Sequence, residues 1–392
     1  MEEWKEYRLG DIITISSGFP YKGEFIGCGD NYILGMGCVS FKETFLPSGM
    51  RSYSSNSPER YLAYPGDIVL ATRQQSDNMP ILGMPAIIPN SCSGKNLIIG
   101  ANLYKVQNNS EFSNSFLFWL LKSPAYVQHI KSCQTGSTVR MITKANIENF
   151  YFYAPQKEER NKISNFLWNI ERKIELNRQI NDNLEQQAQA LFKSWFVDFE
   201  PFKDGEFVDS ELGMIPKGWK IGTLGDIADV SSGKRPPMKQ SEMTPDINIP
   251  LIGASSVMGF TNEVLYNKAI LVIGRVGTHG IVQRFNTPCW PSDNTLVIET
   301  TFYEYVNQIL RVIDYKSLNR GSTQPLITQT DLKNQMVLIP NEKVLCDYNE
   351  IASKAMIKFD FNLSEINHLV TIRDTLLPRL MSGELKINEI NC

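Results

Sequence analysis

Histidine is scarce in this chain, and the sequence patterns that most catalytic sites require are missing. The three histidines, His129, His279 and His368, lie far apart in the 392 residues. Their separation argues against a histidine-centred triad and against a histidine-rich metal site. The sequence also lacks a G-x-x-x-x-G-K-[ST] loop, an Asn-Pro-Pro-Tyr or Asp-Pro-Pro-Tyr loop and a convincing acidic-x-Lys nuclease cluster. We therefore expect no catalytic residues and no bound metal.

Paired cysteines and long apolar runs are also missing. The seven cysteines are odd in number and include no C-x-x-C pair, which argues against a zinc site or a redox motif. No charged segment followed by an apolar stretch opens the chain, and no uninterrupted apolar run reaches about 18 residues. We therefore expect a cytoplasmic protein with no membrane partner.

An excess of positive charge is absent as well, because the formal net charge is −3. This value argues weakly against a protein that coats nucleic acid non-specifically. The distribution of charge is more informative than its sum, because two windows, 112–147 and 264–292, contain no acidic residue. The first window holds Lys122, Lys131, Arg140 and Lys144, and the second holds Lys268, Arg275, His279 and Arg284. Either window alone is typical of a solvated face, but their recurrence favours two basic surfaces.

What is present is a repeat that covers almost the whole chain. Near the start, Trp4–Lys5, Leu9–Ile12 and Ser16–Gly18 recur as Trp219–Lys220, Leu224–Ile227 and Ser231–Gly233. Later, Gly136–Thr138, Ile142–Thr143 and Pro155 recur as Gly321–Thr323, Ile327–Thr328 and Pro340. The offset falls from 215 residues (219 minus 4) to 185 (340 minus 155), so the second copy is shorter in its middle. A period this long excludes a solenoid and predicts two duplicated domains, whose constant ends frame different recognition surfaces.

Two long helices are predicted, one after each copy. Residues 156–196 contain no Gly or Pro and carry an apolar heptad seam, and the seam recurs after Pro340. Both seams hold an asparagine at the same repeat position, Asn177 and Asn362, where a polar residue would fix register. We expect an antiparallel coiled coil in which these two asparagines lie close together. The alternative is that each helix packs separately on its own domain.

The globular parts are predicted to be two mixed α+β domains, so the fold class is α+β with pseudo-symmetric halves. Strands are expected at 67–71, 96–106, 269–273 and 294–298, and helices at 116–133 and 304–315. The expected boundaries are residues 1–155 for the first domain, 156–197 for the first long helix, 198–215 for a linker, 216–341 for the second domain, 342–385 for the second long helix and 386–392 for a tail.

Two loop positions in each copy favour DNA binding. Arg73, Gln74 and Gln75 follow one strand, and Arg275, Thr278 and His279 follow its expected counterpart. Arg suits guanine edges and Gln suits adenine edges. The second position is the Gly-Ser-Thr loop, where glycine lets the backbone approach a phosphate and hydroxyls donate to it. Its candidate residues are Ser137, Thr138, Arg140 and Lys144 in the first copy, and Arg320, Ser322, Thr323 and Gln324 in the second. In isolation such loops are usually turns, and their duplication is what favours a site.

Several stretches resemble the specificity subunit of type I restriction-modification enzymes. They are residues 190–199 (ALFKSWFVDF), residues 210–219 (SELGMIPKGW) and residues 376–385 (LLPRLMSGEL). The two junctions from the Gly-Ser-Thr loop to the long helix are also similar to the family. The second junction departs from it, because Pro340 is followed by Asn341, Glu342 and Lys343 without the usual Glu-Gln or Glu-Arg pair.

The resemblance implies a non-enzymatic reader of double-stranded DNA. Two target recognition domains would each read half of a split asymmetric site, and the coiled coil would set the spacer. The family's specificity subunit recruits two methyltransferase subunits, which use S-adenosylmethionine, and restriction subunits, which use ATP and Mg, can join the complex. No cofactor is expected on this chain itself. Two alternatives remain, a recognition subunit of a related type II-like restriction-methylation system and a coiled-coil scaffold that binds no DNA.

Overall fold

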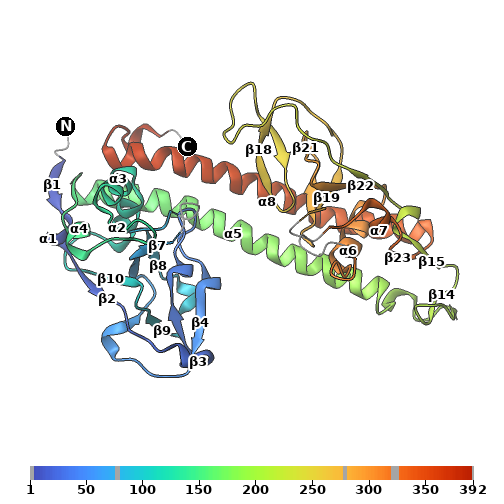
Figure 1. Cartoon of the computed structure of the whole chain (residues 1–392), viewed down its shortest axis with the longest axis horizontal. Coiled ribbons are helices and arrows are strands. Elements are labelled where there is room, and N and C mark those ends of the chain that lie inside the picture. Colours follow the sequence, from blue (N-terminus) through green and yellow to red (C-terminus); the bar gives the residue numbers. More distant parts are fainter. Residues whose placement is uncertain (1–3, 76–79, 277–279, 319–325, 391–392) are drawn as a thin grey trace. The chain divides into compact units, whose positions relative to one another are not determined.

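The computed structural model describes residues 4–75, 80–276, 280–318 and 326–390. The chain divides into two compact units, of which the first holds residues 1–176 and 365–392 and the second holds residues 177–364. Each unit is mixed α+β, as the sequence predicts. Each also contains one part of the long helix α5 (Lys157–Phe196) and one part of the long helix α8 (Glu342–Ser382), which are labelled in Figure 1.

The first unit is built on a four-stranded antiparallel sheet. Its strands lie in the order β2 (Ile13–Ser17), β10 (Leu103–Asn108), β6 (Ile68–Ala71) and β8 (Pro85–Ile87). Because successive side chains of a strand point to opposite faces, the two faces of β6 enter different cores. Leu70 packs on the side of helices α2 (Asn114–Lys122) and α3 (Pro124–Cys133). Val69 and Ala71 pack toward a second sheet, made of β4 (Met50–Tyr53), β3 (Ile26–Leu34), β9 (Asn96–Ile99) and β5 (Leu62–Ala63).

The second unit has a sheet of the same design. Its strands lie in the order β16 (Asp229–Ser232), β22 (Thr295–Glu299), β19 (Ile270–Gly274) and β20 (Gln283–Phe285), again all antiparallel. Helix α6 (Tyr303–Val312) packs in one core. A smaller sheet of β18 (Val257–Thr261), β17 (Ile249–Ile252) and β21 (Trp290–Pro291) contributes Ile252 to the other core. Among the described residues of this unit, no helix occupies the place of α3.

The constant ends of the repeat form the frame of each domain. In the first unit, β1 (Lys5–Arg8) pairs with β12 (Tyr151–Ala154), directly before α5. In the second unit, β15 (Lys220–Thr223) pairs with β23 (Met336–Ile339), directly before α8. Short helices α4 (Lys144–Glu148) and α7 (Gln329–Lys333) precede these last strands, and a threonine hydroxyl caps each. The recurring Ile-Thr pairs of the repeat therefore start equivalent helices.

Two predicted elements are divided in the structure. The sequence predicts one helix over residues 116–133, but α2 ends at Lys122 and α3 begins at Pro124. Ser123 is extended and its hydroxyl accepts from the Tyr126 N–H, because Pro124 cannot continue a helix through its own position. The expected strand 96–106 is likewise two strands, β9 and β10, which belong to different sheets.

The segments of α5 and α8 in the first unit pack side by side. Ile170 and Ile174 of α5 share a buried cluster with Ile366 of α8. Arg373 Nη1 donates to Glu171 Oε2 at 2.7 Å, and both side chains are almost fully buried. A buried pair of this kind contributes little net stability when intact but is costly to break, because one charge would then remain buried alone.

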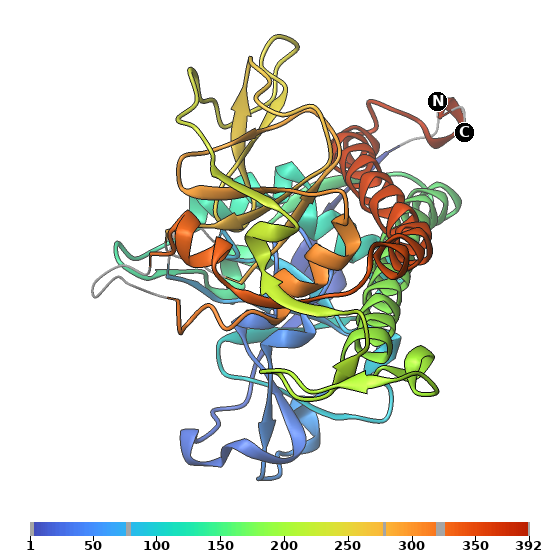
Figure 2. The ribbon, with the colours of Figure 1, turned by 90° about the vertical axis from the view of Figure 1, so that its right-hand side faces the viewer.

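The segments in the second unit pack in the antiparallel sense, and Figure 2 shows them adjacent, α5 in green and α8 in red. Phe192 and Phe196 lie against Tyr348, whereas Asn181, earlier in α5, lies against Asn362, later in α8. Asn362 Nδ2 donates to Asn181 Oδ1 at 2.9 Å, and Asn181 lies four residues after Asn177, which the sequence predicts to be near Asn362. Within each unit the helices therefore pack on each other, and the alternative of wholly separate helices does not hold there.

The segment between α5 and the second domain is ordered by a short hairpin and by aromatic contacts. Strand β13 (Phe207–Val208) pairs with β14 (Ile215–Pro216), and Phe199 and Phe202 contact the Trp219 ring. Of the helices in the described ranges, none is long and apolar enough to cross a membrane.

Candidate nucleic-acid interface

The structure brings together the two loops of the first domain that the sequence singled out. Strand β6 ends at Ala71, and the next short strand β7 (Arg73–Gln74) pairs antiparallel with β11 (Arg140–Met141). Arg73 lies opposite Met141, and Gln74 lies opposite Arg140. The strand-end loop and the Gly-Ser-Thr loop are therefore neighbours in space, although more than sixty residues of chain separate them.

The Gly-Ser-Thr loop is a tight turn held by two backbone hydrogen bonds. The Thr135 N–H donates to Met141 O at 3.0 Å, and the Met141 N–H donates to Thr135 O at 2.8 Å. Gly136 has a φ of +92°, and a Cβ at this position would lie 2.2 Å from Val139 O, so the turn requires glycine. Ser137 and Thr138 are exposed beyond it, and hydroxyls on an exposed turn suit contact with a phosphate.

Cations lie around this turn. Arg73 is exposed and Lys144 is half-buried, and within the described residues neither has a carboxylate partner. Lys144 Nζ lies 5.7 Å from the centre of the Tyr104 ring, whose hydroxyl donates to Ile142 O at 3.3 Å. Burial raises the pKa of the Tyr104 phenol, whereas the Arg73 charge lowers it. Arg73, Arg140, Lys144 and Tyr104 thus form a positively charged, partly aromatic surface, which suits a polyanion.

The two glutamines after Arg73 differ in accessibility. Gln74 is 6% exposed, and its Oε1 accepts from the Leu82 N–H at 3.3 Å. This amide is turned inward, where it holds the strand-end loop, and its side chain does not face solvent. Gln75 is exposed and is free to meet a ligand.

The second domain repeats this strand end with a shift of one residue. The Arg275 N–H donates to Asn294 O at 2.9 Å, and the Ile327 N–H donates to Arg275 O at 3.0 Å. In the first domain Thr72 makes both bonds. The Thr72 N–H donates to Asn102 O at 3.1 Å, and the Ile142 N–H donates to Thr72 O at 3.2 Å. Arg275 therefore corresponds to Thr72.

The residue that corresponds to Arg73 is Val276. Val276 forms a bridge with Leu326, as Arg73 does with Met141, and the offset between Met141 and Leu326 is the 185 residues of the repeat. The expectation that Arg73 and Arg275 occupy the same position is therefore wrong by one residue. Letter identity suggested the match, but the hydrogen bonds of the strand end decide it.

Six candidates in the second copy lie outside the described residues. They are Thr278, His279, Arg320, Ser322, Thr323 and Gln324.

A basic segment of the second domain was missed by the sequence reasoning. Lys234, Arg235 and Lys239 are exposed, and in the part of the chain that the structure describes they make no ion pair. Pro236 and Pro237 lie between them and restrict the backbone. The signal was available, because three cations around two prolines follow directly on the last matched residue of the repeat's start, where the copies diverge.

Both ends of this basic segment, residues 234–239, are anchored. Gly233 packs so closely on the backbone that follows β21 that a Cβ would lie 2.2 Å from Ser292 O. The Trp290 Nε1–H donates to Lys234 O at 2.8 Å. At the other end, Gln240 and Phe260 exchange two backbone hydrogen bonds of 3.0 and 2.8 Å. The segment therefore presents its cations from a fixed frame.

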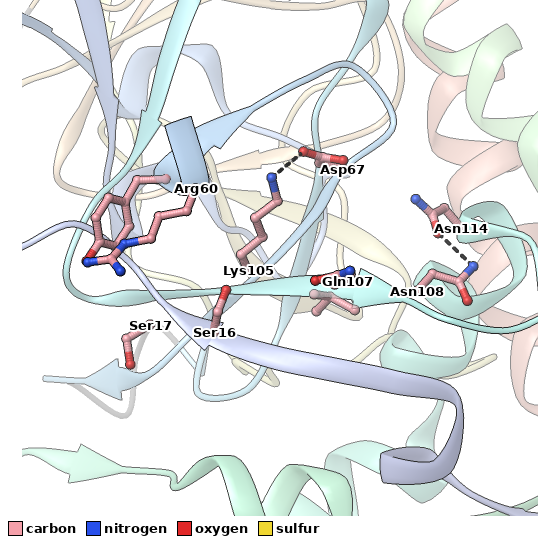
Figure 3. A pocket seen from close by; sticks show the side chains of 10 residues that line it. Ser16, Ser17, Arg60, Asp67, Lys105, Gln107, Asn108 and Asn114 are labelled. Carbon is pink, nitrogen blue, oxygen red and sulfur yellow. Dashed lines mark hydrogen bonds and ion pairs between the residues drawn. The ribbon is translucent and has the colours of Figure 1, made fainter. Parts of the chain in front are cut away.

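A polar hollow of about 850 Å³ lies on the first domain, between β2, β10 and the segment before β5 (Figure 3). Its lining includes Ser16, Ser17, Arg60, Lys105 and Gln107. Lys105 Nζ is already held by Asp67 Oδ2 at 3.2 Å and by Leu62 O at 2.7 Å. This partly neutralised recess is a weaker site for a polyanion than the Arg73 surface.

In the described ranges, no three His, Cys, Asp or Glu side chains gather where they could hold one metal ion. What the arrangement offers is exposed cations, hydroxyls and amides on anchored loops. These groups bind phosphate and base edges.

Comparison with known proteins identifies the family. Residues 1–186 and 216–368 match the family described as type I restriction modification DNA specificity domain. The chain is 27% identical to the type I restriction enzyme MjaIX specificity subunit of Methanocaldococcus jannaschii, over 98% of this chain and 89% of the relative. It is 24% identical to the HindI specificity subunit of Haemophilus influenzae, over 98% of this chain and 100% of the relative.

Among solved structures, the type I restriction-modification system S subunit from M. genitalium aligns with a TM-score of 0.60 at 15% identity, over 97% of this chain and 96% of that one. At this identity the likeness shows the fold alone. Together with the family match it confirms the resemblance that the repeat junctions indicated. The chain belongs to the type I restriction-modification specificity family, and it is a DNA sequence-specificity subunit.

Proposed function

We propose that each domain reads one half of a split, asymmetric DNA site. The observation that carries this proposal is the pair of equivalent strand ends, which share their backbone hydrogen bonds but differ in side-chain chemistry. Equal frames with unequal side chains are what two readers of different half-sites require. A scaffold that binds no DNA has no need of exposed cations, such as Arg73, beside them.

The contacts divide into two kinds. Arg73 and Gln75 are proposed to reach base edges, because their side chains are exposed at the strand end. The residues proposed to contact phosphate are Ser137, Thr138, Arg140 and Lys144 in the first domain and Lys234, Arg235 and Lys239 in the second. The proposed DNA surface of the second domain also includes Thr278, His279, Arg320, Ser322, Thr323 and Gln324. Gln74 would support the first surface from within the domain, and Arg275 would support the second.

The two long helices are proposed to form one antiparallel coiled coil that sets the spacer between the half-sites. The antiparallel contacts within the second unit and the paired helices within the first support this reading. A seam of about 33 residues would span roughly 50 Å. Since a DNA turn measures about 34 to 36 Å, half-sites one to one and a half turns apart would fit. Asn177 and Asn362 would contribute to its register.

The partners we propose are two methyltransferase subunits, with restriction subunits in the full complex. The named relatives support this, because they are specificity subunits of type I restriction enzymes. S-adenosylmethionine would be bound by the methyltransferase, and ATP and Mg by the restriction subunit. The chain itself would act in the cytoplasm as a non-catalytic component.

Exchange of one domain's variable part tests independent reading. Residues 22–131 are replaced by the corresponding part of a related specificity subunit, and the methylated motif is determined by sequencing the modified bases of a host genome. We expect one half of the motif to change and the other half and the spacer to remain. A motif changed in both halves would contradict independent reading. A matched exchange of residues 234–318 should alter the other half, and a gel shift with the methyltransferase present separates readers from scaffolds.

A further inference from the structure

We propose that residues 73 and 276 are the equivalent base-reading positions of the two domains, and that Arg73 contacts a guanine whereas Val276 contacts the methyl group of a thymine. This inference rests on the proposed reading of DNA by the strand-end loops. It departs from a match by letter, which would pair Arg73 with Arg275.

The equivalence of 73 and 276 follows from the backbone. In the first domain the N–H of Thr72 donates to Asn102 O, just before β10, and the O of Thr72 accepts from the Ile142 N–H. In the second domain Arg275 makes the same two bonds, to Asn294 O just before β22 and from the Ile327 N–H. Positions 73 and 276 then lie opposite Met141 and Leu326. Two domains that use one frame present the same position to the same groove.

The side chains at 73 and 276 point away from those at 72 and 275, because neighbours in an extended segment alternate. Thr72 is 7% exposed, and its hydroxyl donates to Asn102 O at 3.0 Å, so its side chain points into the domain. The Nε of Arg275 is likewise buried and has no hydrogen-bond partner among the described residues. Arg73 is exposed, and Val276 is half-buried.

The chemistry at this position differs between the domains in a way that DNA can read. A guanidinium donates to the O6 and N7 atoms of guanine, and an aliphatic side chain packs on the C5-methyl group of thymine. Both groups lie in the major groove, so one position can serve both purposes. Arg275 would instead position the strand end, and its loss should weaken all duplexes alike.

Duplexes with single-atom changes test the assignment directly. The chain reconstituted with its methyltransferase partner is titrated with its cognate duplex, in which each guanine in turn is replaced by 7-deazaguanine and each thymine by uracil. We expect roughly fivefold weaker binding with 7-deazaguanine at one position of one half-site, and this penalty should vanish in Arg73→Ala. Uracil at one position of the other half-site should weaken binding roughly fourfold, and Val276→Ala should remove that penalty.

Arg275→Ala is the matched control, and it should lower affinity for every duplex while keeping both single-position penalties. The penalties at all other positions report that each variant still folds and docks. If the wild-type complex does not prefer its own motif over a scrambled one, the proposed function itself fails. If it does prefer the motif but both single-position penalties survive in Arg73→Ala and Val276→Ala, the assignment of these two positions is overturned.

Discussion

At the scale of single residues, the least expected group is a lysine inside the first domain. Lys122 ends α2, and its Nζ donates to Phe41 O at 3.1 Å and Glu43 O at 2.7 Å. Burial lowers the pKa of this amine from 10.5 to about 8, and the Arg373 cation acts in the same direction, while Glu171 and nearby carboxylates oppose both. Lys122 thus hydrogen-bonds the loop at Phe41 and Glu43 and interacts electrostatically with the buried Arg373–Glu171 pair of the long helices.

The lowered pKa makes the stability of this unit depend on alkaline pH. Between pH of about 8 and 10.5 the unfolded chain holds a proton that folded Lys122 has lost, so Lys122 contributes a rise of the free energy of unfolding with pH across this window. The buried Cys38 thiol, whose pKa burial raises to about 11, contributes a fall above about pH 9. Below about 8 the lysine is charged in both states and the slope disappears. Lys122→Met should remove the Lys122 contribution, and so lower the slope, in urea unfolding curves followed by the fluorescence of buried Trp119 and half-buried Trp168, which contact each other.

Lys131→Met is the control for Lys122→Met, because Lys131 is exposed on α3. It should leave the slope unchanged. An unchanged slope in Lys122→Met would show that Lys122 does not titrate in this window.

The sequence alone located part of the interface but not the one-residue shift between the strand ends of the two domains. Arg73 and Arg140 could be identified from the sequence, because each lies in a loop that recurs in both copies. The shift between Arg73 and Arg275 could not be read, because it is set by which backbone N–H reaches Asn102 or Asn294. The inward turn of Gln74 depends on the Leu82 N–H, which no sequence pattern signals.

At the scale of elements, periodicity predicted the long helices well and the short elements less well. Helix α5 begins and ends within a residue of the expected segment 156–196, because forty residues without Gly or Pro leave few alternatives. The break between α2 and α3 depends on one Ser-Pro step, and the partner of Asn362 depends on how two helices slide past each other. The heptad seam of one helix does not specify which residues of the partner helix it meets, because that register is decided by side-chain packing.

The basic segment 234–239 should act on DNA binding as an element rather than residue by residue. Replacing Lys234, Arg235 and Lys239 by Gln should weaken binding to cognate and mismatched duplexes by the same factor. The slope of log affinity against log salt should fall by up to about 2.7, or about 0.9 for each phosphate that is no longer neutralised. Titration of the reconstituted methyltransferase across a salt series measures both effects.

Two lysines that are already paired provide the control for the basic segment. Lys268 is bound to Glu299, and Lys333 Nζ lies 3.2 Å from Asp229 Oδ1. Their replacement by Gln should leave the salt slope unchanged, because their charge is locally neutralised. An equal drop in the slope for the control, or weaker binding confined to the cognate duplex, would contradict the proposed role in phosphate binding.

At the scale of the whole molecule, the two compact units divide both long helices. The boundary falls between Leu176 and Asn177 in α5 and between Ser364 and Glu365 in α8. Each unit therefore keeps its own domain, its own helix contacts and its own buried polar pair, Arg373 with Glu171 in one and Asn362 with Asn181 in the other. Duplication in the sequence predicted two domains, but the sharing of each helix between units follows only from the antiparallel contacts.

This division allows the proposed ruler to be lengthened without disturbing either unit. Seven residues inserted into both helices at the unit boundary keep the heptad pattern and every contact within the units. At about 1.5 Å per residue the insertion adds roughly 10 Å, or about three base pairs of DNA. We expect the methylated motif to keep both half-sites and to gain a spacer longer by that amount, as read from the modified bases of a host genome. Exchanging one native heptad of each helix for the inserted sequence, at constant length, should leave the spacer unchanged. Retention of the original spacer in the lengthened protein would show that the helices do not set it.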